Sequence, residues 1–309
     1  MFSFLKKKGN VNEIPEWASF FTGKEYTFFI IEIKKYLDHL SVSYEILDGI
    51  IKVEDAIFGL NQLGLVNVAQ VCKQNKMAEY GEIITEHFNA LIRSNNFNEE
   101  FEKNINDFEK VKPYLGVRLY HHDYFEKVGI KNTIGTYLTE TVYCTLVFNL
   151  PDSINSVKPE QAENWGQNSE ELIKLGIKNI KQNHEWEITE ERIGNLKIWF
   201  VQSEHFFGPN IVFDLKNRKE LLNDMGVLIA MPHRHAVIIY PIKTLEVVDA
   251  INSLIPIVDG MNQEGPGSLT NQLYYYKNEI FLNLPYKLSD GKVEFTPPDE
   301  FIEVLNNLQ

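Results

Sequence analysis

Two short histidine-containing segments are the places in this sequence where side chains could do chemistry. His121-His122-Asp123 puts two imidazoles and a carboxylate on consecutive residues, and His233-Arg234-His235 puts two imidazoles two residues apart. Residues two apart on an extended backbone point to the same face, so His233 and His235 could bind zinc together with a ligand from elsewhere. If the two segments met in the folded chain, their four histidines could form one metal site.

The sequence also allows a purely structural role for both segments, and we favour that role. Neither segment has the ligand spacing of a recognised zinc motif such as His-Glu-x-x-His. We expect His233 and His235 to lie free in a surface turn between two strands, and His121 and His122 to end a strand. Accordingly, we predict no bound metal and no cofactor.

Glu140 and Arg234 are the other candidates for a binding site. Glu140 could act as a general acid or base if it were buried, because burial raises the pKa of a carboxyl group. The favoured alternative is an ordinary polar residue on a solvated strand face. Arg234 could be held half-buried by an ion pair with an acidic neighbour such as Glu140. The candidate binding residues are therefore Glu140, His233, Arg234 and His235, and the sequence identifies no catalytic residue.

The signature motifs of several large enzyme classes are absent from the sequence. It contains no Gly-x-x-x-x-Gly-Lys-Ser/Thr motif for phosphates, no Gly-x-Gly-x-x-Gly motif for dinucleotides and no Gly-x-Ser-x-Gly motif for a serine nucleophile. The glycine cluster at residues 264–268 contains a proline and has no lysine after it, which is typical of a connecting loop. Tyr274-Tyr275-Tyr276 could offer an aromatic face to a protein partner, although core packing is favoured.

Composition limits the partners and the compartment. The 309 residues include 30 basic and 43 acidic ones, and the resulting net charge of −13 repels nucleic acid and anionic lipid. Neither Cys72 nor Cys144 belongs to a Cys-x-x-Cys motif, and we expect buried free thiols in a reducing compartment. No apolar run approaches the roughly 18–20 residues that span a bilayer, so a cytoplasmic location is expected.

Residues 1–112 are predicted to form a small helix–strands–helix domain that ends in an acidic linker. Apolar stripes at helical spacing predict helices over residues 25–40 and 78–92. Asp48-Gly49, between them, is a preferred two-residue hairpin turn, so the residues on either side predict paired strands. The apolar stretch that follows, residues 56–71, is expected as strand and loop.

Residues 113–309 are predicted to form a larger domain. The polar stretch at residues 94–110 is expected as a linker or a solvated helix before the boundary. Asn168 or Ser169 could cap a helix in which Gly176 costs about 1 kcal/mol against alanine. The other helices are predicted over residues 211–222, 244–255 and 301–308. The strands are predicted over residues 115–120, 141–150, 196–201, 227–231, 236–240, 273–276 and 280–284.

Strands that come mostly as hairpins with helices between them indicate the α+β class. We expect antiparallel or mixed sheets covered by helices, in two domains, and no doubly wound parallel sheet.

From about residue 113 to residue 295, the chain resembles the bacterial YtpQ-like family, a domain of unknown function. The matching features are Leu-Thr-Glu-Thr at residues 138–141, the helix over residues 170–179 and the apolar strand that runs into Pro232. In that family the proline is followed by a variable residue, a polar residue that is often arginine, and commonly aspartate. Arg234 keeps this pattern and His235 departs from it. The resemblance implies an α+β fold and a cytosolic bacterial setting, and no particular reaction.

Three functions are compatible with the sequence. The leading hypothesis is a cytosolic binding or protein-interaction protein without catalysis of its own, because catalytic motifs are missing and the charge is strongly acidic. One alternative is a metal-dependent hydrolase that uses the two histidine segments. The other is an acidic immunity or inhibitor protein whose surface covers a basic partner.

Overall fold

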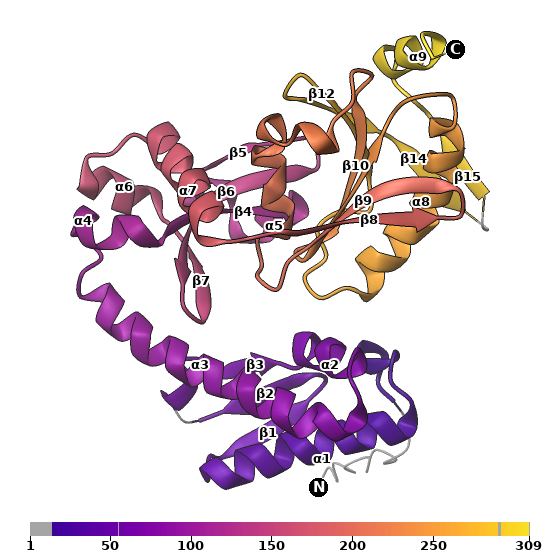
Figure 1. Ribbon diagram of the computed structural model, residues 1–309. Coiled ribbons are helices and arrows are strands. Elements are labelled where there is room, and N and C mark those ends of the chain that lie inside the picture. Colours follow the sequence, from indigo (N-terminus) through magenta and orange to yellow (C-terminus); the bar gives the residue numbers. More distant parts are fainter. Residues whose placement is uncertain (1–13, 55, 290–291, 309) are drawn as a thin grey trace, which may run out of the picture. The chain divides into compact units, whose positions relative to one another are not determined.

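The structure, a computed structural model, describes residues 14–54, 56–289 and 292–308 (Figure 1). The chain divides into two compact units, Met1–Glu100 and Phe101–Gln309. Helices and antiparallel sheets occur in both units, which confirms the predicted α+β class. The division falls before the expected boundary near residue 112, and the independence of the two units as domains stays a prediction. No helix in the described ranges combines the length and the apolar character that crossing a membrane requires.

The smaller unit begins with a well-capped helix and a tight hairpin. Its elements are η1 (Glu16–Ala18), α1 (Gly23–Leu40), β1 (Tyr44–Leu47), β2 (Ile50–Val53), η2 (Ala56–Phe58), β3 (Gln62–Gly64), α2 (Val66–Lys73), η3 (Met77–Glu79) and α3 (Tyr80–Glu102). Thr22 and Glu25 form a capping box at the start of α1, with the Thr22 N–H 2.7 Å from the Glu25 carboxylate. Asp48 and Gly49 both have positive φ, 46° and 75°, as the predicted hairpin turn requires.

The prediction of strand and loop over residues 56–71 is wrong in its second half. The short β3 strand forms, but α2 follows it at once and buries Val68, Ala69 and Cys72 on one face. A short apolar run fits both the helical and the strand period, so its type depends on tertiary packing. The expected second helix is also longer than predicted, because α3 continues to Glu102 through part of the polar stretch.

In its described residues, the larger unit contains three antiparallel sheets (Figure 1). Its first elements are α4 (Phe108–Val111), η4 (Lys112–Tyr114), β4 (Leu115–His121), α5 (Asp123–Val128), η5 (Ile130–Asn132), β5 (Gly135–Tyr137), β6 (Val142–Leu150), β7 (Ser153–Ser156), α6 (Pro159–Trp165) and α7 (Ser169–Asn183). The later ones are β8 (Glu187–Ile193), β9 (Leu196–Gln202), η6 (Gly208–Phe213), η7 (Leu215–Asn217), η8 (Lys219–Leu221), β10 (Val227–His233), β11 (Ala236–Pro241), α8 (Val247–Glu264), β12 (Leu273–Lys277), β13 (Ile280–Leu284), β14 (Tyr286–Ser289), β15 (Lys292–Phe295) and α9 (Asp299–Asn306).

The strand order defines the layers of the larger unit. A four-stranded sheet has the order β4-β6-β5, with β7 paired to β6, and a six-stranded sheet has the order β13-β12-β10-β11-β9-β8. The pair β14-β15 forms a further hairpin, which the sequence did not predict. Helix α8 packs on β10, and its buried side chains join the core of the six-stranded sheet. The strands predicted at residues 227–231 and 236–240 and those at residues 273–276 and 280–284 pair as the hairpins β10-β11 and β12-β13, and the strand predicted at residues 196–201 pairs with β8.

Helix α7 packs on β4 with almost no space between the two backbones. The side chain of Asn168 caps the helix by accepting from the N–H of Glu170 at 2.8 Å, as one of the two predicted caps. A Cβ added at Gly176 would lie 2.9 Å from both the carbonyl carbon and the oxygen of Gly116. Glycine is therefore needed at this position because the strand lies where a side chain would be.

The segment predicted to be a helix over residues 211–222 instead forms three 3₁₀ turns, η6 to η8. The carboxylate of Asp214 accepts hydrogen bonds from Asn217 and Arg218 and pairs with Lys181. These side-chain bonds hold the segment in separate 3₁₀ turns, without the continuous series of backbone hydrogen bonds of an α-helix. The first turn lies against both β4 and β11, and buried Asn210 donates to the Val117 carbonyl at 2.7 Å.

Buried side chains of β12 tie the six-stranded sheet to the four-stranded one. Tyr274, Tyr275 and Tyr276 are all buried, which favours core packing over an exposed aromatic face. The hydroxyl of Tyr274 lies 2.6 Å from that of Thr141, immediately before β6.

Both cysteines are buried free thiols, as predicted. Burial raises the pKa of each thiol to about 12. We expect neither Cys72 nor Cys144 to react quickly with a disulfide reagent in the native protein near neutral pH, because the reactive thiolate is scarce and covered. Both should react after unfolding in guanidinium. Complete labelling of either native thiol within seconds would contradict this expectation.

Candidate functional site

Two arginine side chains from different sheets of the larger unit contact the same phenylalanine ring. Arg118 belongs to β4, and Arg234 belongs to the turn between β10 and β11. The guanidinium carbon of Arg234 lies 4.2 Å from the centre of the Phe206 ring, and that of Arg118 lies 5.6 Å from it. Arg118 also lies over Tyr120, two residues further along the strand, at 4.7 Å. Phe206 is 37% exposed, so this arginine pair is close to solvent.

Two glycine-containing loops hold the backbone of Arg234 in place. The Arg234 N–H donates to the Gly267 carbonyl at 3.1 Å, and the Gly208 N–H donates to the Arg234 carbonyl at 3.0 Å. A Cβ at Gly267, where φ is +71°, would lie 2.6 Å from the Arg234 side chain, and a Cβ at Gly208 would lie 2.9 Å from the Arg234 carbonyl oxygen. The connecting loop predicted at residues 264–268 therefore covers the turn and orients the arginine.

The histidines on either side of Arg234 are half-buried and hydrogen-bonded, so the expectation of free surface histidines is wrong. His235 Nε2 accepts from the Nε of Arg234 at 3.0 Å, and its Nδ1 lies 3.0 Å from the Ser203 carbonyl oxygen. These two contacts require a neutral ring with its proton on Nδ1. His233 Nδ1 accepts from the N–H of His235 at 3.3 Å. The burial comes from the two covering loops, which the local sequence did not reveal.

Neither arginine has an acidic partner among the residues that the structure describes. The side chain of Arg118 donates no hydrogen bond there, and its Nε is buried, while the side chain of Arg234 donates only to His235. Glu140 is exposed and makes no ion pair with Arg234, so the predicted pairing of these two residues is wrong. Burial, together with the charge of Arg118, lowers the pKa of Arg234 to about 10, so the Arg234 side chain stays charged at neutral pH.

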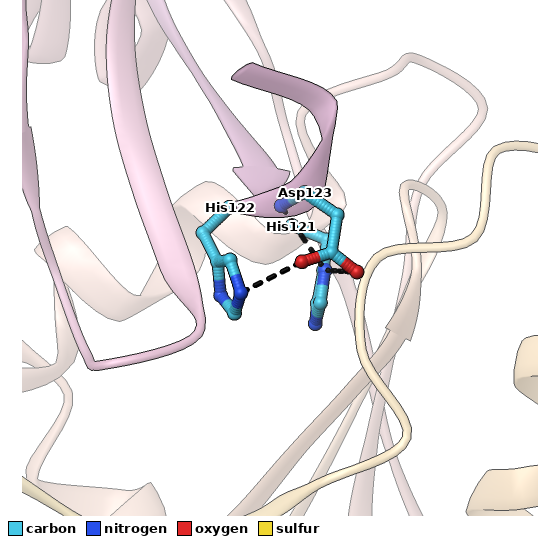
Figure 2. Close-up of side chains that lie close together, drawn as sticks. All are labelled: His121, His122 and Asp123. Atoms are coloured by element: carbon cyan, nitrogen blue, oxygen red, sulfur yellow. Dashed lines mark hydrogen bonds and ion pairs between the residues drawn. The ribbon is translucent and has the colours of Figure 1, made fainter. Parts of the chain in front are cut away.

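The second candidate site is the segment His121-His122-Asp123, where β4 ends and α5 begins (Figure 2). Figure 2 shows the Asp123 carboxylate in contact with both imidazole rings, 3.3 Å from His121 Nδ1 and 2.7 Å from His122 Nε2. Ligand atoms of the three residues lie within 4.8 Å of one another. In the described parts of the chain, this group includes neither His233 nor His235, so the four histidines do not form one such cluster. Burial lowers the pKa of His121, and Asp123 opposes that change.

A close histidine pair near the arginine pair, with tilted rings, was not predicted from the sequence. The rings of His184 and His205 lie 4.3 Å apart, and the His205 Nδ1 accepts from the Phe207 N–H at 3.1 Å. That contact fixes the loop carrying Phe206. Arg118, Tyr120 and Phe206 were not predicted as site residues either. Alternation on the predicted strand could have placed Arg118 and Tyr120 on one face, but nothing local indicated that Phe206 would reach them.

The half-buried histidines predict a loss of stability in acid. Burial, with a contribution from a neighbouring histidine in each case, lowers the pKa of His184 and of His233 from 6.5 to about 4. The unfolded chain takes up these protons near pH 6.5 and the folded chain only near pH 4, so the free energy of unfolding falls as the pH drops between these values. We expect a loss of about 1 kcal/mol per histidine, after allowing for the solvent near each ring.

Urea unfolding at a pH near neutral and at one below about 5 measures this dependence. His184→Gln should reduce the dependence, and the same change at exposed His39 should leave it intact. An unchanged pH dependence in the His184 variant would contradict the assignment.

Comparison with known proteins identifies no relative of this chain. No protein-family model, no curated protein and no solved structure matches it. The resemblance of residues 113–295 to the YtpQ-like family therefore stays a prediction.

Proposed function

We propose that the protein is a binding protein whose larger unit holds an anionic group, a carboxylate or a phosphate, between Arg118 and Arg234. The observation that supports this most directly is that two guanidinium groups share the Phe206 ring, with no acidic partner for either in the described residues. Placing two like charges together near buried surface is unfavourable unless a ligand compensates them. An anion would supply the opposite charge and accept the hydrogen bonds that the protein does not.

Arginine suits this role because its planar guanidinium presents a fork of N–H donors that matches a carboxylate or phosphate edge. Arg234 uses one donor on His235 and keeps its terminal nitrogens for a ligand, whereas Arg118 keeps all of its donors. The hydroxyl of nearby Tyr120 can add a further donor. The site is thus locally positive on a chain whose net charge is −13, which favours specific binding at this site over general attraction of anions.

The hydrogen bonds of the adjacent histidines favour binding over catalysis. Both ring nitrogens of His235 are engaged, one with Arg234 and one with Ser203, so the ring is not free to carry a proton to a substrate. Its contacts instead orient the Arg234 side chain. We therefore infer a protein that binds its ligand without converting it.

Two broader proposals accompany this one. The buried free thiols, Cys72 and Cys144, support a cytosolic location, because free thiols persist in a reducing compartment. Pro232 and Arg234, at the end of β10 and in the turn after it, support the proposed YtpQ-like relationship of the larger unit. An acidic inhibitor of a basic protein is the remaining alternative, and its complex should dissociate in high salt.

The direct test is thermal unfolding of the full chain in inorganic phosphate, in acetate and in chloride at equal ionic strength. A ligand at 100 times its dissociation constant stabilises the folded state by about 2.7 kcal/mol, so a specific anion should raise the melting temperature by several degrees. Equal melting temperatures in all three salts would contradict binding of small anions at the arginine pair.

A further inference from the structure

The three consecutive side chains at the end of β4 are arranged as metal ligands. We propose that His121, His122 and Asp123 bind one divalent transition-metal ion of the zinc class, at a site that shares no residue with the arginine pair. The sequence alone favoured a structural role for these residues. In the structure, two imidazole nitrogens and one carboxylate lie close together, which favours metal binding over a purely structural role (Figure 2).

The local fold fixes the backbone that carries these ligands. β4 pairs with β6 as far as His121, which lies opposite Val142. One residue further, the His122 N–H donates to the Thr141 carbonyl at 3.0 Å, so the strand pairing effectively extends into the turn. The chain then turns into α5 at Asp123, which brings the carboxylate back toward both rings. Because the backbone is already held, the ligands need little further ordering to bind an ion.

The distances suit a small tetrahedral ion. Zinc bonds to imidazole nitrogen and carboxylate oxygen of about 2.0–2.1 Å place neighbouring ligand atoms about 3.3 Å apart. His121 Nδ1 and the nearer oxygen of Asp123 are already 3.3 Å apart, and His122 Nε2 needs to move outward from its 2.7 Å contact. The side chains of both histidines are 33% exposed and that of Asp123 is 62% exposed, so this movement is open to them.

Three protein ligands leave the fourth position of a tetrahedral ion for water or another molecule. Two imidazoles and one carboxylate favour zinc, cobalt or nickel over magnesium and calcium, which prefer all-oxygen ligands. When Nε2 of His122 binds the ion, the neutral ring carries its proton on Nδ1, and that atom is buried without a partner in the described chain. Metal sites that lack such an outer hydrogen bond bind about 10–100-fold more weakly, so we expect an exchangeable ion.

The test is titration of the full, metal-stripped chain with cobalt(II), followed by visible absorption, and with zinc(II), followed by calorimetry. We expect one ion per chain and the intense visible bands of low-coordinate cobalt. Asp123→Asn and His122→Ala should each weaken binding at least tenfold, while His39→Ala, at an exposed histidine of α1, should bind as the unaltered chain does. Asp123→Asn preserves the shape of an exposed side chain, so this variant should fold normally. Its circular dichroism spectrum should match that of the unaltered chain.

Absence of stoichiometric binding by the unaltered chain would overturn the proposal. So would binding that persists equally in the Asp123 and His122 variants, because the ion would then lie elsewhere. The metal titration tests this site separately from the arginine pair. The arginine pair is tested by phosphate binding to the metal-stripped chain.

Discussion

Replacing Gly176 by alanine should destabilise the larger unit by about 2–3 kcal/mol, although alanine is the better helix former by about 1 kcal/mol. The added Cβ would lie 2.9 Å from the backbone of Gly116 in β4 and 3.1 Å from a methyl group of Val117. Backbone atoms in a paired strand cannot rotate away as the end of a flexible side chain can. The helix must therefore shift, and the packing of α7 on the sheet is lost with it.

Gly260, within helix α8, offers a matched control. A Cβ added there meets no atom within 4 Å, so Gly260→Ala should stabilise the protein by up to about 1 kcal/mol through helix propensity alone. Urea unfolding followed by tryptophan fluorescence measures both variants. The two substitutions should change the free energy of unfolding in opposite directions, and changes of the same sign would show that the close helix–strand approach is not what requires glycine at position 176.

The second large effect is expected from Arg234→Met, which should weaken phosphate binding about 100-fold. Each hydrogen bond between charged groups contributes about 1.5–3 kcal/mol, and a loss of about 2.7 kcal/mol corresponds to that factor. The ligand-free protein should change by less than about 1 kcal/mol. It loses a hydrogen bond to His235, but Arg118 is relieved of a like charge.

This expectation differs from the loss of about 3–5 kcal/mol that an ion pair with Glu140 would predict. No carboxylate is left uncompensated when Arg234 is removed, because none pairs with it in the described structure. Arg192→Met, on exposed β8, changes the net charge equally and serves as the control. Phosphate affinity that falls equally in both variants would point to general charge attraction, and a severely destabilised Arg234 variant would point to a structural role.

The parts of the fold that depend on local chemistry could be predicted from the sequence. Asp48-Gly49 has the two residue types that tolerate positive φ, and it forms the expected hairpin turn. Asn168 caps α7 because its short side chain reaches the first free N–H groups of the helix. In both cases the deciding interactions join residues that are close neighbours in the chain.

The arginine pair could not be predicted because it depends on residues far apart in the sequence. The alternation of His233 and His235 was visible, but their burial depends on Gly208 and Gly267 in loops from other parts of the chain. The same applies to residues 211–222. There Asp214 forms hydrogen bonds and ion pairs with other polar side chains, and the segment folds as 3₁₀ turns although its apolar residues have helical spacing. The periodicity of a sequence reports on one helix or strand at a time. The burial of these histidines and the 3₁₀ turns instead depend on contacts among several elements.

The origin of the two arginines on separate sheets has a consequence for folding. Arg118 lies on the four-stranded sheet and Arg234 lies in a turn between two strands of the six-stranded one, so the site is complete only after both sheets have formed and met. Intermediates with one folded sheet would lack half of the donors. An anion would therefore bind the fully folded chain alone, slow its global unfolding and protect both sheets together from proteolysis.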